Sequence, residues 1–157
     1  MVIDLRHHRQ LSQGAHADVF LIGDRVFKLF KTFQIQETEL RARWLFQAEC
    51  GGYKTAMADD RAMKHVPMFY GSLVIESVIY TDGSDVSHRY ALGECYEMEY
   101  VEGPESKVSD IEHGRPEVRE MREYFACICI DAADSSVIFP KNGGTFKLID
   151  FRTQYQK

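Results

Sequence analysis

The sequence predicts an α+β fold in which a small antiparallel sheet carries one helix and a shorter mixed part follows. β-Prone runs bounded by turn residues recur through residues 1–101, and one helix-forming run without Pro or Gly, residues 32–49, lies among them. A break rich in Gly and Pro, "EGPES" at 102–106, then separates the rest of the chain. We therefore expect a first part at 1–101 and a second at 102–157.

Composition limits the function classes before any motif is considered. The chain has 157 residues, 45% hydrophobic and 27% charged, which is ordinary for a soluble globular protein of one domain or two small lobes. Its net charge of -5 argues against a nucleic-acid partner held by phosphate contacts. No apolar run reaches the roughly 18 residues of a membrane-spanning helix, so we expect no membrane span. The sequence gives no signal for an oligomeric state.

The cysteines indicate neither a metal ribbon nor a redox motif. None of the four forms a CxxC pair. Cys127 and Cys129 alternate with isoleucines, so we expect them to be small buried apolar residues in a reducing compartment. Residues 1–10 lack the apolar core of a cleaved signal peptide, which is consistent with a cytoplasmic protein.

The elements of the first part follow in a regular order. Residues 17–31 hold two β-prone runs split by "GDR", which is a hairpin signal. The helix at 32–49 is expected to stop at "ECGG". Strand-rich segments at 66–80 and 89–101 follow, and the loop at 81–88 is expected to join them as a hairpin.

The second part is predicted to hold one helix and short strands. "PEVREMREYFACICI" at 116–130 favours a helix, and Pro116 suits its first turn. Two short strands, "SVIF" at 136–139 and "TFKLI" at 145–149, are joined by the turn "PKNGG".

The stretch "LSQGAHADVF" resembles the glycine-rich loop with which protein kinases cover the phosphates of ATP. Gly14 matches the middle glycine, whereas Ser12 and Ala17 stand where the other two glycines usually are. Val19 matches the valine that packs on the adenine. In "VFKLF", Lys28 matches the lysine that holds the α and β phosphates, and its apolar neighbours favour a cation that meets an anion.

Further matches follow in the order that the kinase family uses. The lysine pairs with a helix acid in that family, and both Glu39 and Glu37 are candidates; we prefer Glu39 because the linker from the lysine strand is short. "CYEMEYVEG" resembles the hinge that holds the adenine, with Met98 as gatekeeper and the backbone of Glu99 and Val101 as hydrogen-bonding groups.

"CICIDAADSSVIF" resembles the catalytic loop. Asp131 matches the aspartate that orients the substrate hydroxyl, and Asp134 is its rival if the loop is shorter. Ser136 stands in place of the usual metal-binding Asn, and Ala133 in place of the usual lysine. These two departures favour, as an alternative, a pseudokinase that binds nucleotide or protein as a scaffold.

"KLIDFR" resembles the metal-binding motif, with Asp150 as the Mg²⁺ ligand and Arg152 in place of the usual glycine. Together the motifs resemble the minimal Ser/Thr kinases that bacteria inject into host cells, which lack an activation segment. The resemblance implies a bilobal kinase-like fold with a strongly reduced second lobe and with ATP and Mg²⁺ as cofactors. It also implies an effector that phosphorylates Ser, Thr or Tyr of a host protein.

Overall fold

The computed structural model describes residues 1–32 and 36–154, and for residues 36–41 the backbone alone. It shows an α+β protein with a five-stranded antiparallel sheet and three helices, which confirms the predicted class and sheet. The chain divides into two compact units. Unit 1 is Met1–Gln47 with Tyr70–Tyr100, and unit 2 is Ala48–Phe69 with Val101–Lys157.

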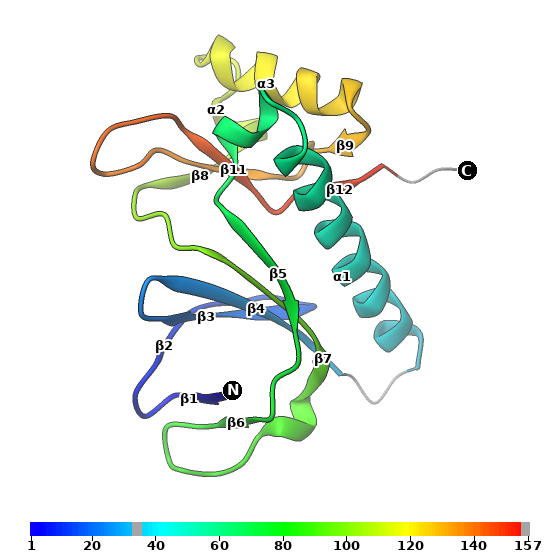
Figure 1. Ribbon diagram of the computed structural model, residues 1–157, viewed down its shortest axis with the longest axis vertical. Helices are drawn as coiled ribbons and strands as arrows, with labels where there is room; N and C mark the ends of the chain where they lie inside the picture. The colour runs from blue at the N-terminus through cyan, green and yellow to red at the C-terminus, as the bar shows by residue number, and fades with distance from the viewer. Residues whose placement is uncertain (33–35, 155–157) are drawn as a thin grey trace. The chain divides into compact units, whose positions relative to one another are not determined.

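The main sheet forms unit 1 and has the strand order β2-β3-β4-β7-β5 (Figure 1). A parallel pair, β1 with β6, lies beside it as a second small sheet. The short 3-10 turn η2 at Ser87–Arg89 precedes the last strand. The strands are β1 (Val2–Asp4), β2 (Arg9–Gln13), β3 (Ala17–Ile22), β4 (Arg25–Lys31), β5 (Phe69–Leu73), β6 (Ser77–Ile79) and β7 (Tyr90–Glu99).

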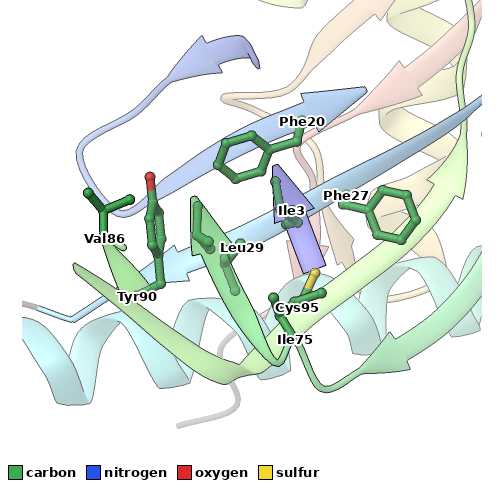
Figure 2. Packing of buried hydrophobic residues seen from close by; sticks show 9 residues of the cluster. Ile3, Phe20, Phe27, Leu29, Ile75, Val86, Tyr90 and Cys95 are labelled. Carbon is green, nitrogen blue, oxygen red and sulfur yellow. The ribbon is translucent and has the colours of Figure 1, made fainter. Parts of the chain in front are cut away.

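One face of this sheet carries the core of unit 1. Alternation along β4 places Phe27 and Leu29 on this face, where Phe20 of β3 and Cys95 of β7 join them (Figure 2). Burying each such side chain contributes roughly 1.5–3 kcal/mol. The full cluster is Ile3, Phe20, Phe27, Leu29, Ile75, Val78, Val86, Tyr90 and Cys95.

The opposite face carries Val26, Lys28 and Phe30. Phe30 meets Phe46 of helix α1 (Gln36–Met57) edge to face, with ring centroids 5.7 Å apart. Through Phe46 the helix therefore contacts the face that holds the lysine, whereas from Ala48 onward it belongs to unit 2.

The expected stop of this helix at "ECGG" is wrong, because α1 runs through both glycines to Met57. The glycines serve packing instead of termination. A Cβ on Gly52 would lie 3.1 Å from the Cα of Arg152, and one on Gly51 would lie 3.0 Å from Cγ2 of Thr153. Glycine costs about 1 kcal/mol inside a helix, but here it lets another segment approach closely.

Unit 2 contains the second half of α1, two further helices and short strand pairs. The strands form a three-stranded antiparallel sheet of order β11-β10-β8 and a two-stranded pair, β12 with β9. The elements are η1 (Ala62–His65), β8 (Glu105–Lys107), α2 (Val108–Ile111), α3 (Pro116–Cys127), β9 (Ile130–Asp131), β10 (Ser136–Ile138), β11 (Lys147–Ile149) and β12 (Arg152–Thr153).

An aromatic cluster forms the core of unit 2. Phe151 is fully buried, with its ring centroid 4.4 Å from Tyr53 and 5.3 Å from Phe125. Tyr53 also stacks on Phe69 at 5.1 Å. The residue that follows Asp150 is therefore a main anchor of this unit.

Two other expectations from the sequence are wrong. Cys127 and Cys129 are exposed, because α3 ends at Cys127 and the backbone of Cys129 turns into the left-handed region with a φ of 65°. The segments on either side of 81–88 do not form a simple hairpin, since β6 pairs with β1. Among the described residues, no helix has the length and apolar character needed to cross a membrane.

Candidate functional site

Lys28 occupies the middle of the central strand of unit 1. It lies opposite Val19 of β3 and opposite Tyr96 of β7, so both neighbouring strands fix its backbone. Its side chain is half-buried, and its Nζ lies 5.6 Å from the ring centroid of Phe30. The sheet thus brings together two residues that the sequence assigns to nucleotide binding, Val19 and Lys28.

Gly14 lies in the tight turn between β2 and β3. Its N–H donates to the carbonyl of Ala17 at 2.9 Å, and a Cβ at this position would come within 2.8 Å of the same oxygen. The turn therefore requires glycine for steric reasons at this one position. The neighbouring residues Gln13 and Ala15 are exposed.

The predicted hinge begins at the end of β7. Met98 is buried and lies opposite Val26, while Glu99 is exposed and lies opposite Arg25. Past the strand, the N–H of Tyr100 donates to the carbonyl of Asp24 at 3.0 Å, which extends the strand pairing by one residue. Val101, the last predicted hinge residue, is half-buried and belongs to unit 2.

Glu37 and Glu39 lie in the first turns of α1, but their side chains are outside the described residues. Among the side chains of α1 that the structure describes, Glu49 is the buried acid, with 7% of the residue exposed. A carboxylate is stable in such a place only when other groups compensate its charge.

The sequence analysis missed Glu49, although a signal was present. The residue falls on the apolar stripe of the helix, with Ala42 and Leu45 before it and Ala56 after it. An acid within an apolar stripe predicts a buried carboxylate, which is what the structure has at Glu49.

Asp131 ends β9 in unit 2 and lies opposite Arg152 of β12. Its Oδ1 accepts the N–H of Ala133 at 3.0 Å, which makes a local turn of the loop. Asp134 is exposed, and its backbone carbonyl accepts a hydrogen bond from Nζ of Lys107 at 3.1 Å. The two candidate acids thus differ in role, since the first shapes the loop and the second presents its carboxylate to solvent.

Asp150 follows β11 directly and is exposed, with a φ of 61°. A residue other than glycine in this left-handed region costs on the order of 1 kcal/mol, and such residues cluster at functional sites. The buried side chains of Ile149 and Phe151 hold the backbone on both sides. Packing therefore fixes an unfavourable backbone conformation at the one acid predicted to bind metal.

A second acid, which the sequence analysis also missed, is within electrostatic reach of Asp150. Partial desolvation raises the pKa of Glu105 although the residue is exposed, the negative charge of Asp150 raises it further, and Lys107 lowers it. Glu105 belongs to β8, a strand in the segment that the sequence predicted to be only a break. Pairing with β10 brings it into the same sheet as the strand that ends before Asp150.

Ser136 lies in the middle strand of this sheet, opposite Lys107 on one side and Ile149 on the other. It is only 5% exposed. The hydroxyl that the sequence places at the metal site is thus largely covered.

Of the two predicted metal ligands, Asp150 is exposed and Ser136 is covered. Within residues 1–32 and 36–154, no three His, Cys, Asp or Glu side chains gather as a metal cluster. Mg²⁺ commonly uses one or two carboxylates and completes its shell with water and phosphate oxygens, so the exposed Asp150 fits it. Neither protein-family models nor curated proteins give a match to this chain.

Proposed function

We propose that this protein is a minimal protein kinase that transfers the γ-phosphoryl group of ATP to a Ser, Thr or Tyr hydroxyl of another protein. The observation that supports this most is the setting of Lys28, a half-buried cation in the central strand of a five-stranded antiparallel sheet, directly opposite Val19. The setting of Asp150 adds to it, because buried residues hold this exposed acid in a left-handed conformation.

In this proposal the fold is that of a protein kinase, with residues 1–101 as the nucleotide-binding lobe and 102–157 as a strongly reduced second lobe. The sheet and the first part of α1 support the first assignment, whereas Ala48–Phe69, with the second half of α1, belongs to unit 2. The short strand that ends at Asp131 and the one that precedes Asp150 support the second.

Each proposed residue has a distinct chemical task. The ammonium of Lys28 neutralises charge on the α and β phosphates, and Asp131, or Asp134, orients the attacking hydroxyl. The backbone of Glu99 and Val101 holds the adenine. Phosphoryl transfer depends mainly on positioning and electrostatic stabilisation, so a small frame is sufficient for it.

Apolar contact and metal binding complete the set. Val19 and Met98 pack on the adenine. Gly14 has no side chain, so the backbone of the turn can approach the phosphates closely. Asp150 would hold Mg²⁺, with Ser136 as a weaker second ligand, and the metal would supply charge neutralisation at the phosphates.

The helix acid of this mechanism has two candidates from the sequence, Glu39 and Glu37. Glu39→Gln and Glu37→Gln, each combined with Lys28→Met in a double-mutant cycle for ATP binding, identify the coupled acid.

The proposed substrate is a protein of a host cell, as the resemblance to injected bacterial kinases implies. The net charge of -5 favours basic segments of the acceptor over acidic ones.

One observation favours a pseudokinase as the second candidate. Ser136 replaces the amide ligand and is only 5% exposed, so its hydroxyl is poorly accessible to a metal ion. A scaffold that binds nucleotide without transfer needs neither this ligand nor the lysine that Ala133 replaces.

The test measures MgATP binding and phosphoryl transfer in the same preparation. Wild-type protein is expected to gain thermal stability with MgATP and to label itself or a mixture of Ser, Thr and Tyr peptides from γ-labelled ATP. Lys28→Ala and Asp150→Ala are expected to abolish transfer. Full transfer in either variant contradicts the proposal, and a MgATP-dependent shift without transfer favours the pseudokinase.

A further inference from the structure

A polar network ties the turn at Gly14 to the sheet of unit 1. The Nζ of Lys31 donates to the carbonyl of Gly14 at 2.7 Å and lies 3.0 Å from Oδ1 of Asp18. The backbone N–H of Lys31 also donates to the carbonyl of His16 at 2.8 Å. One lysine therefore contacts both sides of the turn between β2 and β3.

The other end of the network is anchored in the core. Asp18 is 4% exposed, and its Oδ2 accepts the hydroxyl of Tyr90 at 2.6 Å. The ring of Tyr90 belongs to the buried cluster, edge to face with Phe20 at 6.0 Å (Figure 2). The three side chains of Lys31, Asp18 and Tyr90 are called the brace below.

A β-bulge aligns the parts of the brace. Pairing between β4 and β7 shifts register between Leu29 and Lys31, and the shift sets Lys31 directly opposite Tyr90. Bulges commonly redirect a side chain in this way. The side chain of Lys31, the next lysine after Lys28 in the chain, therefore points to the turn.

Backbone contacts also hold the turn, namely the Gly14 N–H bond to Ala17 and the pairing of Gln13 with Asp18, but its tip is exposed. Gln13, Gly14 and Ala15 are exposed, and glycine adds backbone freedom. Burial makes the Asp18 carboxylate stable only with charged or hydrogen-bonding partners, which Lys31 and Tyr90 provide. The brace thus adds side-chain contacts to an exposed glycine turn.

We infer that Lys31 is a positioning residue for nucleotide binding, which holds the Gly14 turn in place through the brace before a nucleotide arrives. This inference rests on the proposed kinase function. A turn that is already fixed loses less conformational entropy when it covers phosphates, so the brace lowers the cost of binding. Lys31 acts through the backbone of Gly14 and does not touch the nucleotide.

The first part of the test needs no nucleotide. Amide hydrogen exchange of residues 13–17 is compared in wild type, Lys31→Met and Tyr90→Phe, with Lys54→Met, an exposed lysine of α1, as the matched control. The brace predicts exchange faster by about tenfold in both brace variants and unchanged in the control. Tyr90→Phe keeps the core ring, so it remains informative if Lys31→Met folds poorly.

The second part measures MgATP affinity and transfer in the same proteins. Loss of the brace is expected to raise the KM for ATP by about tenfold with little change in kcat, and Lys31→Arg is expected to restore part of the affinity. Lys28→Met, in contrast, is expected to remove kcat.

The outcomes separate the two claims. Unchanged exchange at 13–17 in both brace variants overturns the inference, whatever the protein does with ATP. Faster exchange with unchanged ATP affinity overturns the positioning role. A wild type that binds no MgATP overturns the kinase proposal and, with it, the role in nucleotide binding, while the exchange data still show whether the brace holds the turn.

Discussion

The turn at Gly14 and the segment around Asp150 are both proposed to meet the nucleotide, but different forces hold them. In unit 1, a hydrogen-bonded and charged brace ends on the carbonyl of Gly14. In unit 2, aromatic packing of Phe151 and close contact with a glycine of α1 hold the chain next to Asp150.

The difference has consequences for how each region responds to change. Apolar packing is sensitive to volume, because interiors are close-packed and respond to a single methyl group. A polar brace is sensitive to the loss of one partner, since the remaining buried group is then left without compensation. Changes in shape are therefore expected to act on unit 2, and changes in hydrogen bonding on unit 1.

The largest effect is expected from Phe151→Ala. Removing a fully buried aromatic ring should lower the free energy of unfolding by about 3–5 kcal/mol. Urea unfolding measures this loss. Phe146→Ala, which truncates a half-buried ring in the same unit, is the control, and an equal loss in the control would contradict the special place of Phe151.

Gly52→Ala should also destabilise unit 2, although alanine is the better helix former. The new Cβ would lie 3.1 Å from the Cα of Arg152 and from Cδ2 of Phe151, and relief requires a backbone shift that costs roughly 1–3 kcal/mol. Gly93→Ala is the matched control, since nothing lies within 4 Å of its Cβ position. A Gly52→Ala protein with raised thermal stability would show that the glycine does not serve close packing.

Tyr90→Phe is expected to weaken unit 1 by about 1–2 kcal/mol, because it removes one hydrogen bond to the buried Asp18 while it keeps the ring in the core. The melting temperature of the variant against wild type measures the effect. No change in melting temperature would mean that water or another group replaces the hydroxyl at no cost.

The smallest effect concerns pH and His65. Burial lowers the pKa of His65 below 6.5, with contributions from Lys147, Arg61 and Lys64, although the hydrogen bond to the carbonyl of Phe146 opposes this. The unfolded chain therefore binds the proton more readily, and stability should fall as pH drops below the unfolded pKa.

Thermal unfolding between about pH 7.5 and about pH 5.5 checks this sign against His65→Gln. The variant should lose less stability than wild type over that interval. A steeper loss in the variant would contradict the assigned direction of the shift.

Features with a local sequence signal could be predicted, whereas features that depend on residues far apart in the chain could not. Local patterns were sufficient for the antiparallel sheet, and the apolar neighbours of Lys28 were sufficient to predict the strand that contains it. The predicted helix end at "ECGG" was wrong, because a glycine pair looks the same in the sequence whether it ends a helix or lets a second segment pack closely against it. That distinction depends on Arg152 and Thr153, which lie far away in the chain.

The brace and Glu105 were beyond local patterns for a related reason. Lys31 and Tyr90 meet through a β-bulge, and a bulge changes register without a distinct sequence signature. Glu105 reaches the neighbourhood of Asp150 only through the pairing of β8 with β10. Glu49 alone could have been found, from its place on an apolar helix stripe.

The most direct test of the central claim is transfer of the γ-phosphoryl group from labelled MgATP by wild type, Lys28→Met and Asp150→Asn, with each protein checked for folding by circular dichroism. The account predicts labelled protein or peptide with wild type and a loss of at least about a hundredfold in both variants. Undiminished transfer by a folded variant, or the absence of any MgATP binding by wild type, would contradict it.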